Sequence, residues 1–149
     1  MASDDQLNAN PFPSTLSRLC NKRIAELLMK LSLTKTFRFE AAHWLPCFPE
    51  GHKCRRMHGH SFVVDVVVEG DVDPAKGYLM DFAEIRKATD PVCDELDHYC
   101  LNEIEGLENP TAEMLAVWIY DRLKPTLPLL KLVRLRETCT SEAEYCGEC

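Results

Sequence analysis

The chain has 149 residues, of which 46% are apolar and 28% are charged, as is typical of one compact domain that buries its own core. Its 24 acidic and 17 basic residues give a net charge of −7 with no basic stripe, which argues against nucleic acid as a main partner. The unbroken apolar runs are far shorter than the roughly 20 residues of a membrane-spanning helix, and no secretory leader opens the chain, so we expect a cytoplasmic protein without a membrane partner.

The first part of the chain is predicted to be a tail followed by a helix. Residues 1–13 are polar and contain two prolines, a pattern typical of disorder. From Ser14 to Leu31 the apolar residues recur with helical spacing, which predicts an amphipathic helix that docks on the domain or on a neighbouring subunit. Its polar face is too short and too mixed in charge to favour a membrane surface. We therefore divide the chain into an N-terminal tail and helix, residues 1–32, and one folded domain, residues 33–149.

After this helix the apolar period changes from 3.6 to 2, which predicts strands. Residues 33–43 alternate with His43 on the apolar side, and residues 58–68 alternate with His58 and His60 on the apolar side. The two segments are joined by a long loop, and such loops in compact domains are commonly functional. We expect a pair of neighbouring strands with this loop at one end.

Two helices are predicted next. Asp81 is a good N-cap for a helix that starts at Phe82, is kinked or restarted by Pro91 and runs on towards Leu101. A second helix opens around residues 108–111, with Pro110 suited to its first turn. Its predicted buried stripe consists of Met114, Leu115, Trp118, Ile119 and Leu123.

The last elements are predicted to be strands again. Residues 132–138 alternate, and a short strand around residues 144–146 closes the chain. The order strand, strand, helix, helix, strand, strand implies an α+β fold, in which a four-stranded antiparallel sheet carries both helices on one face. The extra N-terminal helix lies outside this unit.

The eight cysteines are many for this length. In a cytoplasmic chain of this size, free thiols with metal or catalytic roles are more common than disulfides, so we expect reduced cysteines. Cys93 and Cys100 are predicted to lie within the first of the two domain helices. Cys146 and Cys149 form a lone C-x-x-C pattern, for which no second pair indicates a metal or redox site.

Three of the five histidines are predicted to converge. His58 and His60 are two residues apart on a strand, so both rings project from one face. His43 ends the preceding strand on its apolar side, and pairing of the two strands brings it within a strand spacing of the others. A single histidine on an apolar face is commonly a hydrogen-bonded core residue, but three at one point favour a metal. Zinc fits best, because catalytic zinc sites use three protein ligands and leave a fourth position open.

Cys54 lies four residues before His58 and has two interpretations. It is either the fourth ligand of a closed structural site or a free thiol that acts as general base and acid beside the metal. The flanking Lys53, Arg55 and Arg56 favour the second interpretation, because positive charge stabilises a thiolate. The same three residues either dock an anionic substrate or simply form a solvated loop.

Two further groups are candidates for chemistry. Asp97 and His98 follow the first domain helix, where a turn lets the carboxylate orient or ionise the imidazole for relayed proton transfer. Glu137 continues the apolar side of Val133 and Leu135, and a carboxylate on a buried face needs a partner. A ligand with amidine-like N–H donors would be such a partner.

Five short motifs in this order resemble the 6-pyruvoyl-tetrahydropterin synthase family from about Lys35 to Glu148. Within the family, the chain is most similar to the bacterial branch that forms 6-carboxy-5,6,7,8-tetrahydropterin for queuosine biosynthesis. The spacing of three residues between Cys54 and His58 favours this branch over the pyruvoyl-forming one. The motifs are Phe39-Glu40-Ala41-Ala42-His43, Cys54-x-x-x-His58-Gly59-His60, Leu96-Asp97-His98, Asn109-Pro110-Thr111-Ala112-Glu113 and Glu137-Thr138.

The resemblance implies the tunnelling fold for residues 33–149, in which subunits join their sheets into a barrel. It implies a homohexamer built as a dimer of trimers, with active sites shared between subunits. It also implies that Zn²⁺ is bound by His43, His58 and His60.

The implied reaction converts 7,8-dihydroneopterin triphosphate, a pterin with a phosphorylated side chain, and releases acetaldehyde and triphosphate. Cys54 would be the catalytic proton acceptor, Asp97 and His98 would form a relay that reaches the site from a neighbouring subunit, and Glu137 would complete the catalytic set by anchoring the pterin ring. Further substrate contacts are implied for Thr111, Glu113, Lys53 and Arg55.

Three alternatives stay open at this point. The first is triphosphate elimination of the 6-pyruvoyl-tetrahydropterin synthase type. The second is a cupin-like metalloenzyme, which His58-Gly59-His60 and Asp65 loosely resemble, although Asp65 points to the opposite face of the strand. The third is a zinc-stabilised binding module in which Cys54 closes the metal site.

Overall fold

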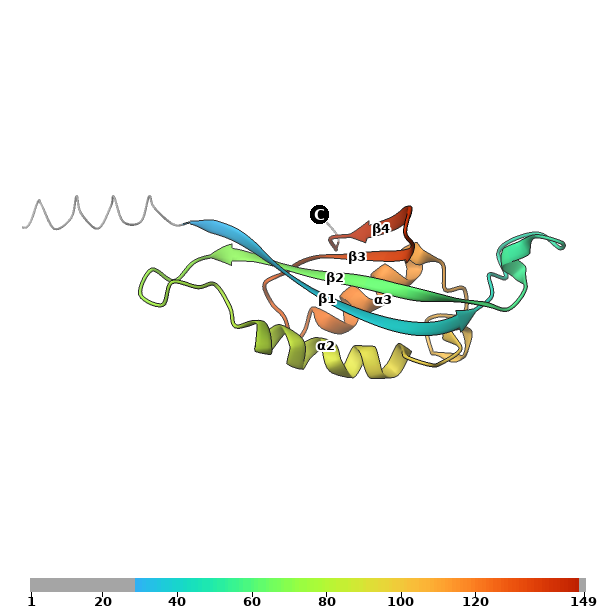
Figure 1. The fold of residues 1–149 in the computed structure, drawn as a ribbon, viewed down its shortest axis with the longest axis horizontal. Coiled ribbons are helices and arrows are strands. Elements are labelled where there is room, and N and C mark those ends of the chain that lie inside the picture. Colours follow the sequence, from blue (N-terminus) through green and yellow to red (C-terminus); the bar gives the residue numbers. More distant parts are fainter. Residues whose placement is uncertain (1–28, 148–149) are drawn as a thin grey trace, which may run out of the picture.

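The computed structural model describes residues 29–147, which form one four-stranded antiparallel sheet and two helices (Figure 1). The strands are ordered β1-β2-β3-β4 across the sheet, so each strand lies beside its neighbours in sequence. Helix α2 packs along β1, and α3 packs along β3 and β4. The predicted α+β class and the order ββααββ are confirmed. The elements are β1 (Lys30–His43), β2 (His58–Asp71), α2 (Phe82–Leu96), α3 (Ala112–Leu123), β3 (Leu130–Thr138) and β4 (Ser141–Tyr145), with 3-10 turns η1 (Lys53–Arg55) and η2 (Leu101–Glu103).

The long pair of strands β1 and β2 positions the functional end of the molecule. Its register runs without interruption from Lys30 opposite Asp71 to His43 opposite His58. Alternate side chains of both strands point into the core beneath the sheet, which agrees with the predicted period of 2. The predicted histidine face is therefore the core face, and the histidines lie where the core ends.

The core is a single apolar cluster between the sheet and the two helices. Its buried residues come from β1, β2 and β3 and from both helices, and Tyr145 of β4 packs against them. The helices therefore cannot separate from the sheet without exposing apolar surface. The largest fully buried apolar side chains are Phe39, Phe62, Ile85, Leu96, Leu101, Leu107, Leu115, Ile119, Leu123, Leu127 and Leu135.

Helix α2 begins as predicted and ends earlier. The Asp81 carboxylate accepts a hydrogen bond from the Ala83 N–H, which confirms the N-cap, and Pro91 lies inside the helix without ending it. The expected extension towards Leu101 is wrong, because the backbone after Leu96 turns to pair with β1. Cys100 consequently lies outside the helix, in an isolated bridge to Ala42.

Helix α3 differs from its prediction in two details. Thr111 is the N-cap and its hydroxyl accepts from the Met114 N–H, so Pro110 precedes the cap and does not occupy the first turn. Met114 is 47% exposed and does not belong to the buried stripe. The other four predicted stripe residues are buried.

The ends of the domain also need correction. The predicted helix of residues 14–31 falls mostly outside the described residues, and its last two residues, Lys30 and Leu31, belong to β1. They pair with Asp71 and Gly70, and this tertiary pairing outweighs the local helical spacing. The last strand is Ser141–Tyr145, earlier than the predicted 144–146. The boundary between residues 32 and 33 stays a prediction.

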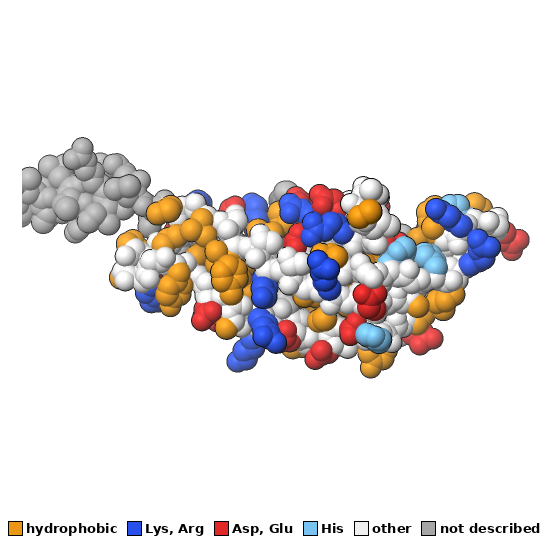
Figure 2. Space-filling model, viewed as in Figure 1, with side chains coloured by type: hydrophobic (Ala, Val, Ile, Leu, Met, Phe, Trp, Pro, Cys, Tyr) orange, Lys and Arg blue, Asp and Glu red, His pale blue; other side chains and the backbone are white. Residues whose placement is uncertain are grey.

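The cysteines between residues 29 and 147 are all free, as expected for the reduced state, whereas Cys20 and Cys149 lie outside this range. Among the same residues, neither helix is long and apolar enough to cross a bilayer. Figure 2 shows histidine side chains gathered at one end of the molecule, beside a protruding lobe that carries lysine and arginine side chains.

Candidate metal centre

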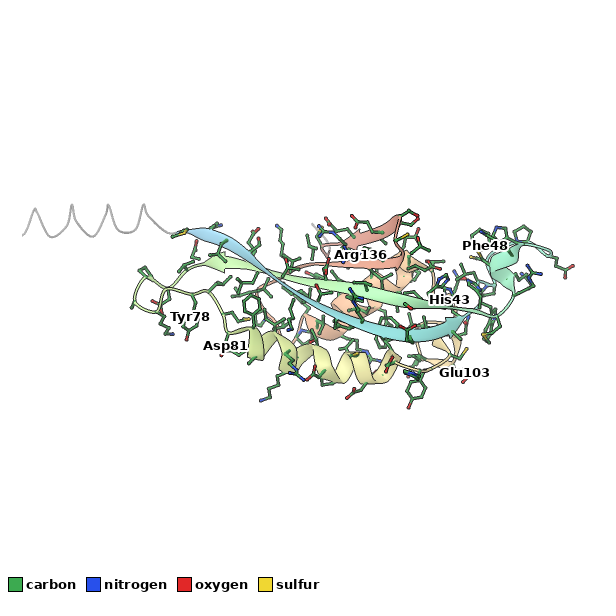
Figure 3. All side chains as sticks on the ribbon, viewed as in Figure 1. His43, Phe48, Tyr78, Asp81, Glu103 and Arg136 are labelled. Atoms are coloured by element: carbon green, nitrogen blue, oxygen red, sulfur yellow. The ribbon has the colours of Figure 1, made fainter. Side chains whose placement is uncertain are left out.

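The three predicted histidines meet where β1 and β2 end. His43 is paired directly with His58, and His60 is paired with Ala41 two residues further along the strands. The ring centroids lie 4.6 Å apart for His43 and His58, 5.2 Å for His43 and His60, and 5.0 Å for His58 and His60. The convergence predicted from strand parity is thus present, and Figure 3 locates His43 at this end of the sheet.

Two of the imidazoles are held through their Nδ1 atoms. His43 Nδ1 lies 2.9 Å from the Pro110 carbonyl oxygen, and His58 Nδ1 lies 2.7 Å from the Arg56 carbonyl oxygen. A carbonyl oxygen can only accept a hydrogen bond, so in both rings Nδ1 carries the proton and Nε2 offers its lone pair. This second contact is typical of metal-binding histidines, because it fixes both the tautomer and the ring orientation.

Within residues 29–147, the Nε2 atoms of His43 and His60 are buried and have no hydrogen-bond partner. Burying a polar atom without a partner costs free energy, so such atoms in a native site call for an explanation. The Glu137 carboxylate lies nearby, with Oε1 2.8 Å from His60 Nε2 and 3.4 Å from His43 Nε2. One ligand atom from each of His43, His58, His60 and Glu137 fits within 4.8 Å of the others. A bound metal ion would satisfy these atoms, and imidazole nitrogen with carboxylate oxygen is a donor set that zinc accepts.

The protonation states suit metal binding. Burial lowers the pKa of His60, against the opposing effect of the Glu137 charge. The contact with His43 is the largest cause that lowers the pKa of the Glu137 carboxyl, and the neighbouring His60 lowers it further. Metal ions bind neutral imidazole and ionised carboxylate, which are the forms that these shifts favour at neutral pH.

Cys54 lies beside the metal centre but is not one of the four grouped ligands among residues 29–147. It is half-buried on η1, where the His52 ring accepts a hydrogen bond from the Cys54 N–H at 3.1 Å. The Cys54 carbonyl accepts from the Leu45 N–H at 2.8 Å, which ties η1 back to the end of β1. This placement favours a free thiol near the metal over a fourth ligand.

Two cavities meet at Cys54, Glu137 and Ser141. The first, called the basic cavity, has a volume of about 490 Å³ and is lined by Lys53, Arg56, Met57, His58, His60 and Thr138 besides the three shared residues. The second, called the acidic cavity, has a volume of about 380 Å³ and is lined by Leu45, Phe48, Thr111, Ala112, Glu113, Glu142 and Ala143 besides them. A ligand with an anionic end and an N–H-rich end would match this division of charge.

The basic residues of the loop have separate positions. Arg55 Nη1 donates to the carbonyl oxygens of Pro46 at 2.9 Å and Phe48 at 2.7 Å, so this predicted substrate residue holds the loop together. Lys53 and Arg56 line the basic cavity. The sequence prediction chose Lys53 and Arg55, and residue type alone could not separate Arg55 from Arg56.

The predicted pair Asp97 and His98 lies in another part of the chain. Asp97 Oδ2 is 2.8 Å from His98 Nδ1, and its Oδ1 accepts from the Glu40 N–H at 2.9 Å. These two hydrogen bonds, that from Glu40 first, lower the pKa of the Asp97 carboxyl. His98 has a left-handed backbone with φ of 63°, and its N–H donates to the Glu40 carbonyl at 2.6 Å. This strained conformation is fixed by pairing with β1.

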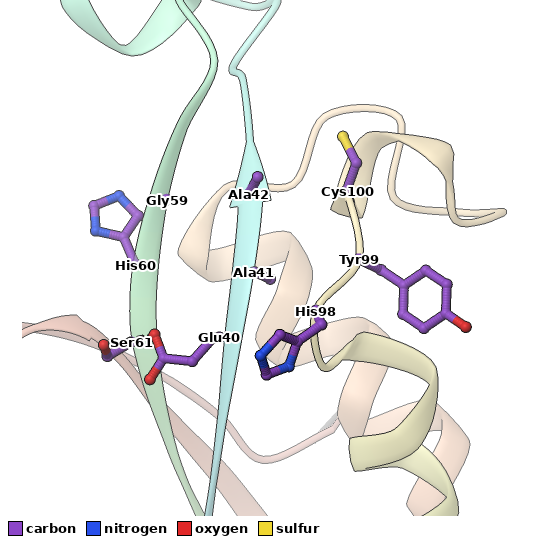
Figure 4. Close-up of a pocket in the computed structure, with 9 residues that line it drawn as sticks. All are labelled: Glu40, Ala41, Ala42, Gly59, His60, Ser61, His98, Tyr99 and Cys100. Atoms are coloured by element: carbon purple, nitrogen blue, oxygen red, sulfur yellow. Dashed lines mark hydrogen bonds between the residues drawn. The ribbon is translucent and has the colours of Figure 1, made fainter.

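The single chain does not bring His98 to Cys54. His98 lines a third cavity of about 510 Å³, together with Glu40, Ser61 and Tyr99. Figure 4 shows the His98 ring on the β1 side of this cavity and His60 on its β2 side. The relay expected from the sequence is therefore not assembled with the thiol within one subunit.

The contact of Glu137 with the imidazoles was missed by the sequence analysis, which assigned Glu137 to the pterin alone. The alternation along β3 did indicate that Glu137 faces the core side, because Glu137 follows Val133 and Leu135 at every second position. The contact itself also requires the register of β2 and β3, which no single strand pattern encodes.

The chain resembles known proteins over nearly the whole described region. The family model described as 6-pyruvoyl tetrahydropterin synthase matches residues 32–148. The chain is 48% identical over 117 residues to a 6-carboxy-5,6,7,8-tetrahydropterin synthase of Synechocystis sp., covering 74% of this chain and 89% of that protein. It is 42% identical over 108 residues to a dihydroneopterin monophosphate aldolase of Pyrococcus furiosus, covering 72% of this chain and 88% of that protein. Among solved structures, the Caenorhabditis elegans 6-pyruvoyl tetrahydropterin synthase is similar with a TM-score of 0.76 and 27% identity, covering 81% of this chain and 98% of that chain.

Proposed function

The chain belongs to the 6-pyruvoyl tetrahydropterin synthase family, and from this premise we propose that it is a carbon–carbon lyase, a 6-carboxy-5,6,7,8-tetrahydropterin synthase. Its substrate is 7,8-dihydroneopterin triphosphate, and acetaldehyde and triphosphate are released with the carboxylated pterin. The pathway is queuosine biosynthesis. The family and its fold also remove the cupin alternative, because one sheet with helices on one face is not a double-sheet barrel.

One observation carries the proposal: two cavities of opposite charge meet at a thiol beside three converging imidazoles. The imidazoles of His43, His58 and His60 would hold Zn²⁺, and the buried Nε2 atoms of His43 and His60, which have no hydrogen-bond partner within residues 29–147, support this assignment. Bound there, zinc supplies Lewis-acid polarisation of the substrate's side-chain oxygens. A closed structural site with Cys54 as fourth ligand has less support, because the ligand atoms that lie close together include the Glu137 carboxylate and not the Cys54 thiol.

Cys54 is placed to move protons at the substrate side chain. Cys54 lines both cavities, where the side chain of a pterin spanning them would pass. Lys53 and Arg56 line the basic cavity beside it. Cys54 is therefore the proposed general base.

The two cavities would hold the two ends of the substrate. The acidic cavity presents Glu113, Glu137 and the Thr111 hydroxyl to the N–H groups of the pterin ring, with Phe48 as an apolar wall. The basic cavity presents Lys53 and Arg56 to the phosphates, which the net charge of the chain would otherwise repel.

Asp97 and His98 complete the proposal as a proton relay supplied by a neighbouring subunit. The support is the exposure of the His98 side chain, 78%, and its place in a cavity that Cys54 does not line. A homohexamer made of two trimers would provide such neighbours.

The direct test is product analysis after incubation of the zinc-loaded protein with 7,8-dihydroneopterin triphosphate. We expect 6-carboxy-5,6,7,8-tetrahydropterin and acetaldehyde, with strongly reduced product formation by Cys54→Ala. A pyruvoyl product would assign the chain to the sister activity. Cleavage to a hydroxymethyl-pterin would assign it to an aldolase activity, for which the Pyrococcus relative is the precedent.

A further inference from the structure

Glu137 is the one residue of the metal centre that also lines both cavities. Its carboxylate lies 2.8 Å from His60 Nε2 and 3.4 Å from His43 Nε2. It also belongs to the walls of the basic and the acidic cavity, so a small rotation changes what it faces. Its side chain is 22% exposed, in contrast to the fully buried His43.

The backbone at Glu137 is held less firmly than the backbone of the histidines. The pairing of β3 with β2 ends at Arg136 opposite Val63. On the other side, the register of β3 with β4 shifts between Arg136 and Thr138, so the ladder passes over Glu137. Irregularities of this kind re-aim a side chain next to a site.

The histidines, by contrast, have little freedom. His43 and His58 face each other in an unbroken ladder, and each is tethered through Nδ1 to a carbonyl oxygen. The centre thus combines two tethered imidazoles, and His60 in the same unbroken ladder, with one carboxylate at an irregular position of the β3–β4 ladder.

We propose that Glu137 is the fourth ligand of the metal in the substrate-free protein and leaves it when the pterin substrate binds. The inference rests on the proposed function, because it needs both a metal and a pterin at this site. A zinc ion with four protein ligands is closed, whereas catalysis needs an open position. Departure of Glu137 opens that position and frees its carboxylate for the N–H groups of the pterin ring in the acidic cavity.

The exchange couples metal access to substrate recognition. While the acidic cavity is empty, the carboxylate stays on the metal and excludes other oxygen ligands. A pterin ring in the acidic cavity offers N–H donors to the same carboxylate, and the two positions compete for it. A ligand that cannot supply these donors leaves the metal closed.

The test is the affinity of the protein for Zn²⁺, measured by competition with a chromogenic chelator, for the wild type and for Glu137→Gln. We expect the variant to bind zinc about 10-fold or more weakly, because a charged ligand has been lost. The matched control is Glu142→Gln, which removes another carboxylate from the acidic cavity, and we expect wild-type affinity there. Glu137→Asp keeps the negative charge on a shorter side chain, so we expect a zinc affinity between those of the wild type and Glu137→Gln. This variant provides the test if Glu137→Gln does not fold.

The visible spectrum of the Co²⁺-substituted protein gives a second readout. We expect Glu137→Gln to change the spectrum of the substrate-free protein, and neopterin to change that of the wild type. Wild-type zinc affinity and an unchanged Co²⁺ spectrum in both Glu137 variants would overturn the inference while leaving the proposed function intact. A wild-type protein that binds no stoichiometric metal would instead overturn the proposed function itself.

Discussion

Two contacts between a histidine and a carboxylate have the same length and opposite surroundings. His60 Nε2 lies 2.8 Å from Glu137, and His98 Nδ1 lies 2.8 Å from Asp97. The His60 side chain is 21% exposed and the His98 side chain is 78% exposed. The separation of the two atoms is therefore no guide to the role of either pair, and the surroundings decide it.

The physical consequence differs for each pair. Burial lowers the pKa of His60, so its ring stays neutral and its lone pair is available to a metal ion. His98 is exposed at the end of α2, and the Asp97 carboxylate 2.8 Å from its Nδ1 orients the ring, which suits a group that accepts and returns a proton. The first pair belongs to the candidate metal centre, and the second is the pair that we propose serves a site on another subunit.

The largest expected effect comes from removing a buried imidazole. His43→Ala should lose stoichiometric metal and all measurable turnover, because it removes a ligand whose orientation is fixed by Pro110. The loss of metal affinity should exceed the roughly 10–100-fold that follows from removing an outer hydrogen bond of such a ligand. Metal content by elemental analysis is the measurement. The variant of the exposed histidine, His98→Asn, should keep its metal. Loss of metal from both variants would contradict the separate roles of the metal centre and the Asp97–His98 pair.

The next effect comes from the thiol. Cys54→Ala should lower turnover by about 10²–10⁴-fold, as expected for loss of a general base, and should retain its zinc. Alkylation of the Cys54 thiol in the wild type should likewise lower turnover while zinc stays bound. A variant that loses both zinc and turnover would show that Cys54 is a ligand, contrary to our assignment.

A smaller effect on turnover is expected at the exposed pair, about 10²-fold for His98→Asn and less for Asp97→Asn. Because the relay is proposed to act across subunits, mixed oligomers of Cys54→Ala and His98→Asn subunits should regain part of the activity. Each parent alone is the control. Mixing without any recovery, in oligomers shown to contain both chains, would argue that the pair does not serve a neighbouring site.

The smallest effect concerns stability and pH. The pKa of Asp97 is lowered in the folded protein, chiefly by the Glu40 N–H and then by His98. A carboxyl of this kind stabilises the fold above its unfolded pKa, and the contribution is lost as the pH falls through the folded value. The gap in the free energy of unfolding between the wild type and Asp97→Asn should thus be widest at neutral pH and close below about pH 4. Urea unfolding across this range measures it, and a gap that widens in acid would have the wrong sign.

Strand parity and spacing predicted the architecture and the three imidazoles because these features repeat locally. His43, His58 and His60 are on the core side of their strands by count alone, and Asp81 caps α2 by its residue type. The features that escaped depend on long-range pairing. The early end of α2 follows from the bond between the His98 N–H and Glu40, and the entry of Lys30 and Leu31 into β1 follows from β2.

In the candidate site, too, the residues could be chosen from local patterns, whereas their contacts could not. Glu137 was chosen for its parity, but its approach to His60 depends on where the β3 ladder shifts. The position of Arg55, turned to Pro46 and Phe48, depends on the path of the loop. Neither is encoded in a short motif.

We propose that three imidazoles, and no thiol, hold the metal. X-ray absorption at the zinc edge of protein purified without chelator tests it directly. We predict one zinc per chain with nitrogen and oxygen neighbours at about 2.0–2.1 Å and no sulfur shell. A sulfur neighbour near roughly 2.3 Å, or the absence of stoichiometric metal, would contradict the account.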